Sequence, residues 1–282
     1  MNILEAIILG IIQGLTEFIP ISSTGHLTVA GKLMNLISDV NPERWTAFIA
    51  VIQLGTLLAV IIYFWKDLWL ILRDFISEVL VKRKSFSSQS QNSLMGWYLV
   101  IATIPVIIIG LGLKEMIEGA LTKNLYVISG SLIILAVILA FAEKTGKFNR
   151  SYGDIKWYDA LLIGVAQSFA LIPGSSRSGT TITAAIFLGF SRETAARFSF
   201  LMSIPAIAAS GLLQFYIALN YIDSKGLITL IVATIISGIF GYLSIEFLLR
   251  YLKNKTTFIF IIYRIVIGVI ILVIVYNGII KP

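Results

Sequence analysis

The sequence predicts an all-α integral membrane protein with about six transmembrane helices and two re-entrant helical hairpins in an inverted repeat. Three features support this fold class. The composition is strongly apolar, six apolar stretches are long enough to cross a bilayer, and two interrupted apolar regions resemble each other. We expect a single membrane domain, 1–282, made of two inverted-topology halves at about 1–142 and 143–282.

Composition excludes several classes of protein. Hydrophobic residues make up 57% of the 282 residues and charged residues only 13%, whereas a soluble domain has about 25% charged residues. The mean hydropathy is +0.92. Soluble enzymes and disordered chains are therefore excluded. The absence of cysteine and the single histidine, His26, exclude disulfides, thiolate metal sites and sites with several imidazoles. In a membrane protein the net charge of +7 indicates a cytoplasmic face rather than nucleic-acid binding.

Six stretches have the roughly 20 apolar residues that a helix needs to cross the hydrocarbon core. They lie near 46–65, 94–113, 124–142, 194–219, 227–249 and 257–280. The section 66–93 is amphipathic and ends in a basic, Ser- and Gln-rich run, which predicts a surface helix followed by a loop.

Two further apolar regions, about 5–37 and 157–190, are interrupted near their middle. The first is broken by 20–25 (PISSTG) and the second by 173–179 (PGSSRSG). Unwound backbone at membrane depth is tolerated where protein or a water-filled cavity surrounds it, so both regions predict re-entrant hairpins. An offset of 154 residues aligns them without a gap; it pairs Ala6, Gly10, Gln13, Ser22 and Gly25 with Ala160, Gly164, Gln167, Ser176 and Gly179. Interrupted segments at matching places in two halves indicate a binding site near the membrane midplane.

Loop charge predicts the orientation. The segments 66–84, 143–159, 192–197 and 250–255 carry net charges of +2, +1, +1 and +3, whereas 32–44, 114–123 and 223–225 are neutral. If each hairpin returns to its own side, all positive segments share one face, which is cytoplasmic by the positive-inside rule. Both termini and the entry of the first hairpin then lie on the outer side, and the second hairpin enters from the cytoplasm.

The first interruption carries a carboxylate, hydroxyls and the histidine. Gln13 and Glu17 share one helix face, and Ser23 and His26 are three residues apart, so we expect them to meet across one turn. A helix cap at 22–24 and a buried histidine are the alternative explanation. The presence of Glu17 beside the only histidine favours function.

The second interruption has the composition of a phosphate-binding loop. Over 173–181, five hydroxyls and one guanidinium, Arg177, surround Gly174 and Gly179, and the glycines let backbone N–H groups approach a ligand. A helix that starts near Ser178 presents its positive end to an anion, and arginine matches phosphate oxygens. Packing of small residues explains the glycines and serines but not the buried arginine.

The remaining intramembrane charges have a simpler interpretation. Glu246 and Arg264 lie toward the ends of their helices, where we expect snorkelling or paired structural charges. The two interruptions together predict an anion site with a carboxylate and a hydroxyl nucleophile. A carboxylate near phosphate normally requires a cation between them, so Glu17 is expected to hold a divalent metal. A site inside the bilayer suits phosphates attached to a lipid tail.

Both interruptions resemble the signatures of a known family. The run 13–26 (QGLTEFIPISSTGH) is similar to the first signature of the undecaprenyl-diphosphate phosphatases, the bacitracin-resistance family, and 173–181 (PGSSRSGTT) is similar to the second. The similarity extends through 51–55 (VIQLG) and Tyr263-Arg264, and so covers nearly the whole chain.

The resemblance implies a multi-pass enzyme of the bacterial inner membrane. It would hydrolyse undecaprenyl diphosphate to the monophosphate carrier used in cell-wall synthesis, with Mg²⁺ or Ca²⁺ and an active site on the outer side. The catalytic residues would be Glu17, Ser23, His26 and Arg177. The substrate-binding residues would be Ser22, Thr24, Gly174, Ser176, Ser178, Gly179 and Thr181. Gln13 stands where some members have glutamate, so the metal ligands would be Glu17 and Gln13 without a second carboxylate.

Several questions stay open at the level of sequence. The nucleophile is Ser23, His26 or water, and a homodimer is open; the expected partners are a lipid diphosphate and membrane lipids, with no nucleic acid. The alternative function is a flippase or transporter of the lipid phosphate, because inverted repeats and broken helices are typical of transporters. The phosphatidic-acid-phosphatase superfamily needs a second histidine, which this chain lacks.

Overall fold

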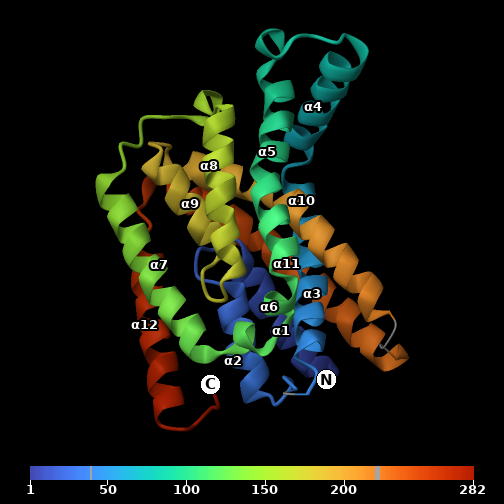
Figure 1. Ribbon diagram of the computed structural model, residues 1–282, viewed down its shortest axis with the longest axis vertical. Helices are drawn as coiled ribbons and strands as arrows, with labels where there is room; N and C mark the ends of the chain where they lie inside the picture. The colour runs from blue at the N-terminus through green and yellow to red at the C-terminus, as the bar shows by residue number, and fades with distance from the viewer. Residues whose placement is uncertain (39, 220–222) are drawn as a thin grey trace.

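A computed structural model describes residues 1–38, 40–219 and 223–282, and these form a bundle of helices (Figure 1). Six of the described helices are long and apolar enough to cross a membrane, in agreement with the six predicted stretches. They are α3 (Pro42–Tyr63), α5 (Gln91–Gly112), α7 (Leu125–Thr145), α10 (Arg192–Ala218), α11 (Ser224–Asn254) and α12 (Phe258–Tyr276). Among the residues described, none belongs to a β-strand; one isolated bridge joins Arg150 and Phe190.

Each interrupted region forms two short helices around a turn. The first comprises α1 (Ile3–Glu17) and α2 (Ser23–Leu33); the second comprises α8 (Trp157–Ser168), a 3-10 turn (Phe169–Leu171) and α9 (Arg177–Phe187). Below we call the segments between them the first hinge (18–22) and the second hinge (172–176). α1 begins at a capping box of Asn2 and Glu5, and α2 and α9 begin at the capping serines Ser22 and Ser176.

The section predicted as a surface helix and loop forms α4 (Trp65–Phe75), which continues into a π-helical turn (Ile76–Val81) and a 3-10 turn (Phe86–Ser88). α4 runs beside α5 at one end of the molecule (Figure 1). Three short elements complete the chain: α6 (Lys114–Glu118), a 3-10 turn (Ala120–Lys123) and a 3-10 turn (Tyr152–Asp154).

Each pair of short helices packs against a long helix from the other part of the chain. α1 lies along α11, and α8 lies along α5, while α3 packs on α10 and α7 on α12. Glycines permit the first two crossings. A Cβ atom on Gly10 would lie 2.6 Å from the Ala233 carbonyl oxygen, and one on Gly164 would lie 2.4 Å from the Ala102 carbonyl oxygen. The repeated Gly-x-x-Gln pattern therefore marks the same kind of close helix contact in both places.

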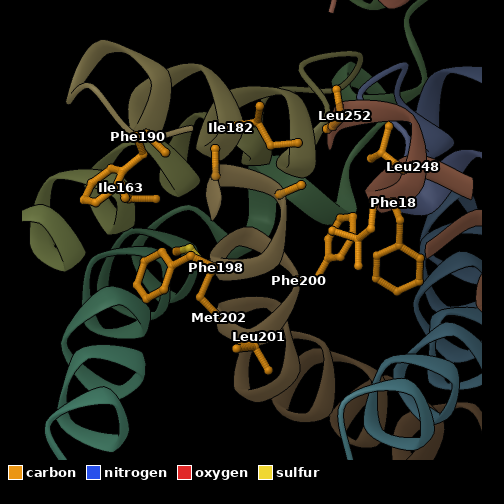
Figure 2. Packing of buried hydrophobic residues seen from close by; sticks show 14 of the residues in the cluster. Phe18, Ile163, Ile182, Phe190, Phe198, Phe200, Leu201, Met202, Leu248 and Leu252 are labelled. Carbon is orange, nitrogen blue, oxygen red and sulfur yellow. The ribbon is translucent and has the colours of Figure 1, made fainter. Parts of the chain in front are cut away.

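The largest hydrophobic core lies beside the first hinge (Figure 2). Phe18, which follows Glu17 directly, is buried and packs edge-to-face on Phe200 of α10 with ring centroids 5.0 Å apart. Leu248 and Leu252 of α11 lie in the same cluster. Burying one such aromatic ring stabilises the fold by roughly 1.5–3 kcal/mol, so this packing fixes the end of α1 and the direction of the Glu17 side chain.

Two of the net-positive segments, 66–84 and 143–159, lie at the same end of the bundle. Both termini lie at one end, and the α4–α5 and α7–α8 connections lie at the other (Figure 1). At that second end Arg150 pairs with Asp159 at 2.5 Å, and Arg192 pairs with Glu143. Hydrogen bonds to Asp159 raise the pKa of Arg150 above its usual value. Of the neutral segment 32–44, Asp39 lies outside the described residues.

Candidate functional site

A cavity of about 420 Å³ lies between the two hinges. Its walls come from both hinges and from α3, α5 and α10. Seven of the predicted site residues line it: Glu17, Ser22, Ser23, Thr24, Gly174, Ser176 and Arg177. Two regions that are about 150 residues apart in sequence thus contribute to one space.

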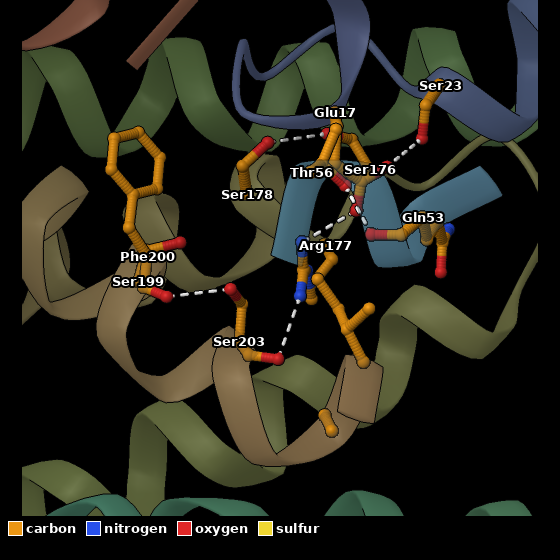
Figure 3. Close-up of polar contacts among 12 residues, drawn as sticks. Glu17, Ser23, Gln53, Thr56, Ser176, Arg177, Ser178, Ser199, Phe200 and Ser203 are labelled. Atoms are coloured by element: carbon orange, nitrogen blue, oxygen red, sulfur yellow. Dashed lines mark hydrogen bonds and ion pairs between the residues drawn. The ribbon is translucent and has the colours of Figure 1, made fainter. Parts of the chain in front are cut away.

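An ion pair across the hinges forms the polar end of this cavity (Figure 3). Arg177 Nη2 donates to Glu17 Oε1 at 2.6 Å, and both side chains are largely buried. Arg177 Nη1 also donates to the Ser203 carbonyl oxygen of α10 at 3.4 Å. Burial makes the pair sensitive to the loss of either partner, because one charge would remain without compensation.

The second carboxylate oxygen of Glu17 is the acceptor for a hydroxyl and an amide. Ser23 Oγ donates to Glu17 Oε2 at 2.6 Å, and Gln13 Nε2 donates to the same atom at 2.8 Å. A carboxylate that accepts a hydrogen bond from a serine hydroxyl can also accept its proton. The Ser23 hydroxyl thus contacts Glu17, a contact that the sequence analysis did not predict.

His26 lies outside the lining of the cavity. Its Nδ1 lies 2.7 Å from the Ser22 carbonyl oxygen, its Nε2 lies 2.8 Å from the Tyr263 hydroxyl oxygen, and its ring stacks on Tyr263. The predicted contact across the helix turn is absent, since the described residues show no hydrogen bond between Ser23 and His26. The imidazole lies between Tyr263 of α12 and the Ser22 carbonyl oxygen, and not against the Ser23 hydroxyl.

The side-chain hydroxyls that follow Arg177 bind the first hinge and α10 and do not face the cavity. Ser178 Oγ donates to the Ile19 carbonyl oxygen of the first hinge at 3.2 Å, and Thr181 Oγ1 lies 2.7 Å from Ser199 Oγ of α10. The Gly179 N–H donates to Ser176 Oγ at 3.1 Å. Ser178, Gly179 and Thr181 do not line the cavity, so these contacts position the hinges.

Arg264 of α12 was expected to snorkel or to pair with a carboxylate, and this expectation is wrong. Its side chain is completely buried. The guanidinium donates to the carbonyl oxygens of Pro20 at 3.4 Å, Ser175 at 2.9 Å, Gly174 at 3.4 Å and Leu132 at 3.2 Å. Arg264 thus binds the backbone of both hinges at once. Two signals for this residue were present in the sequence, a lone arginine within an otherwise apolar stretch and the family resemblance at Tyr263-Arg264.

The charges around the cavity favour an anion. Glu17 is balanced by Arg177, whereas Arg264 has no carboxylate partner among the described residues. The N-termini of α2 and α9, each of 11 residues, begin at the two hinges and add partial positive charge. Phosphate oxygens are the ligands that such an arrangement binds.

The atoms available for a cation are oxygens. Among the described residues no cluster contains three or more His, Cys, Asp or Glu side chains. Besides the Glu17 carboxylate there is Gln13 Oε1, which is buried and has no hydrogen-bond partner in residues 1–38, 40–219 and 223–282. Oxygen ligands of this kind suit a hard cation such as Mg²⁺ or Ca²⁺, and one carboxylate leaves most ligand positions to phosphate oxygens and water.

Two glutamines that sequence reasoning did not select also line the cavity, namely Gln53 of α3 and Gln167 of α8. Gln53 belongs to the 51–55 run, and Gln167 is the offset counterpart of Gln13. Both positions carried a signal, but uncharged amides within apolar helices give no indication of which face they occupy.

Comparison with known proteins identifies the family of this chain. The family model described as "Bacitracin resistance protein BacA" matches residues 6–270. A protein of Syntrophobacter fumaroxidans named undecaprenyl-diphosphatase is 53% identical over 95% of each chain. Proteins of the same name from Chlorobium limicola and Chlorobaculum tepidum are 50% and 47% identical, over 99% and 100% of this chain and 98% and 100% of theirs. The chain therefore belongs to the BacA family of bacitracin resistance proteins.

Proposed function

We propose that this protein hydrolyses undecaprenyl diphosphate to undecaprenyl phosphate and inorganic phosphate. The relatives at about 50% identity are named for this activity, and the chain matches them over nearly its full length. The Glu17–Arg177 pair in the cavity between the hinges is the observation from which we assign this activity to particular residues. A transporter would need an anion site, but not a serine hydroxyl that donates to a buried carboxylate.

The walls of the cavity match the two chemical parts of a lipid diphosphate. The hinge end is polar, as described above. On the side between α5 and α10 the walls are apolar, and Ile107, Leu111 and Leu213 there are 44%, 69% and 48% exposed. We place the diphosphate at the hinges and let the prenyl tail leave between α5 and α10 into the lipid.

Ser23 is the nucleophile in the mechanism that we favour. Its Oγ attacks the terminal phosphorus and loses its proton to Glu17, while the bridging P–O bond breaks and undecaprenyl phosphate leaves. Water then hydrolyses the phosphoserine, which releases inorganic phosphate. Arg177 and the N–H groups at the start of α2 and α9 stabilise the charge on the transferring phosphoryl group. His26 and Arg264 are positioning residues in this scheme.

Glu17 and Gln13 are the residues that would hold Mg²⁺ or Ca²⁺. When bound, the cation supplies positive charge that screens the Glu17 carboxylate from the substrate phosphates. Of these two residues, Glu17 lines the cavity and Gln13 does not.

The two halves of the chain form an inverted repeat of one membrane domain in this proposal, and both hinge regions are re-entrant hairpins. Three observations support it: both hinges share one local conformation, α1 and α8 make equivalent glycine contacts, and the net-positive connections α4–α5 and α7–α8 lie opposite the termini. The positive end then faces the cytoplasm of a bacterial cell, and the termini and the active site face outward across the inner membrane.

Purified protein tests the proposed function directly. We expect it to release phosphate from undecaprenyl or farnesyl diphosphate in detergent, with turnover that depends on Mg²⁺ or Ca²⁺ and ceases with a chelator. Absence of phosphate release from either lipid, together with movement of lipid phosphate across vesicles, would instead establish transport.

A further inference from the structure

The Gly-x-x-Gln pattern occurs at Gly10–Gln13 and again at Gly164–Gln167. The glycine makes the same kind of close helix contact in both regions, but the glutamine has different neighbours. Gln13 donates its amide to Glu17, one helical turn further along α1. Gln167 is the counterpart of Gln13 at the offset of 154, and the counterpart of Glu17 is Leu171. The second copy therefore retains the glutamine without the carboxylate that its amide would bind.

The carboxamide of Gln167 is left without a partner. The residue is 1% exposed, and neither Nε2 nor Oε1 forms a hydrogen bond with any group in the described part of the chain. An unpaired buried polar atom destabilises the fold, and native proteins rarely leave such groups unpaired without a functional reason. Leucine would fill a similar volume at no such cost.

Gln167 lies in the wall of the cavity that also contains Glu17, Ser23 and Arg177. This location separates it from Tyr152, whose buried hydroxyl also lacks a partner but which lies outside the cavity. An amide that is unpaired within the protein and borders an anion site can donate to a ligand there. A neutral amide does so without repelling phosphate, as a glutamate would.

We propose that Gln167 is a substrate-binding residue whose Nε2 donates a hydrogen bond to a phosphate oxygen of the diphosphate. The proposal rests on the proposed function. It adds a contact between the second interrupted region and the diphosphate headgroup. It also explains the loss of the carboxylate at Leu171. A second acid there would repel the substrate and hold the amide away from it.

The experiment compares Gln167→Leu and Gln167→Glu with Tyr152→Phe as the matched control. Both Gln167→Leu and Tyr152→Phe remove an unpaired buried polar group, so we expect each to unfold at an unchanged or higher temperature. Only Gln167→Leu should impair turnover, with kcat/KM for farnesyl diphosphate at least tenfold lower and KM raised. Gln167→Glu should lose more, because its charge faces the phosphates.

The possible results decide the proposal. Gln167→Leu with kcat/KM within twofold of the wild type would show that the amide contacts only water. A fall in Tm of more than about 5 °C in Gln167→Leu would show a structural role. Turnover of the wild-type protein in the same assay tests the proposed function separately, so failure of one is distinguishable from failure of the other.

Discussion

At the first hinge Ser22 has φ 75° and ψ 95° and caps α2, and at the second Ser176 has φ 69° and ψ 112° and caps α9. Each serine Oγ accepts from the N–H of a glycine three residues later, at 3.2 and 3.1 Å. A non-glycine residue in such a conformation costs roughly 1–3 kcal/mol, so both hinges store a similar strain.

The residue that follows the capping serine differs between the two hinges. Ser23 begins α2 and Arg177 begins α9, at equivalent positions of the 154-residue offset. Both side chains reach Glu17, Ser23 through Oε2 and Arg177 through Oε1. The same backbone conformation thus places a hydroxyl of the first hinge region and a guanidinium of the second hinge region against a single carboxylate. The comparison teaches that the hinges share geometry and divide the chemistry.

Removing the guanidinium should produce the largest effect. We expect Arg177→Ala to lower kcat/KM by about 10³–10⁵, the range typical of an arginine that stabilises a transferring phosphoryl group. Glu17→Ala should be similarly inactive. Phosphate release from farnesyl diphosphate measures both.

The same pair predicts a stability pattern. Each single variant leaves one buried charge without its partner, at a cost of about 3–5 kcal/mol. The double variant Glu17→Gln/Arg177→Met should therefore unfold at a higher temperature than Glu17→Gln alone or Arg177→Met alone, while it remains inactive. Additive losses of stability would contradict a direct ion pair.

The hydroxyl at the first hinge should come next in effect. We expect Ser23→Ala to lower kcat by about 10²–10⁴, because the nucleophile and the proton donor to Glu17 are lost. Ser244→Ala is the matched control, since the buried Ser244 hydroxyl donates to the Phe240 carbonyl oxygen within α11 and does not line the cavity. Rapid acid quenching should trap phosphoserine at position 23. A Ser23→Ala protein with more than a tenth of wild-type activity would assign the attack to water.

Arg264 tests whether the two hinges must be held together. Arg264→Met retains the length of the side chain but leaves the Pro20 and Ser175 carbonyl oxygens unpaired. We expect kcat to fall by about 10², the cost typical of small displacements of catalytic groups, together with a lower Tm. Arg250→Met is the control, because Arg250 is exposed and pairs with Glu246 of its own helix. Normal kcat in a less stable Arg264→Met protein would limit Arg264 to folding.

Much of this fold was accessible from sequence for a physical reason. A helix that crosses a membrane must be apolar over a fixed length, so the six spans follow from composition. The hinges were visible because Pro, Ser and Gly interrupt two apolar regions, and the duplication predicted that Glu17 and Arg177 meet.

The remainder depends on directions that sequence does not specify. The side chain of His26 faces Tyr263 instead of Ser23, because the approach of α12 decides which neighbour an imidazole on α2 finds. Arg264 binds backbone carbonyl oxygens of both hinges because α12 packs beside them, and no local sequence pattern predicts that packing. The same holds for Gln167, whose unpaired amide becomes apparent only beside the cavity.

Substitutions on the apolar side of the cavity should have the smallest effect on turnover. They test the contacts of the prenyl tail, whereas the substitutions at the hinges test those of the diphosphate headgroup. Ile107 and Leu213 line the cavity between α5 and α10, whereas the exposed neighbours Ile108 and Leu212 do not. We expect Ile107→Trp and Leu213→Trp to lower kcat/KM for undecaprenyl diphosphate by about tenfold, because a bulky ring occupies the path of the tail. Ile108→Trp and Leu212→Trp are the matched controls. Isopentenyl diphosphate, whose short tail ends inside the cavity, should be hydrolysed equally by all four variants. Equal losses for the long and the short substrate would place the obstruction at the hinges, and the tail would then leave the cavity elsewhere.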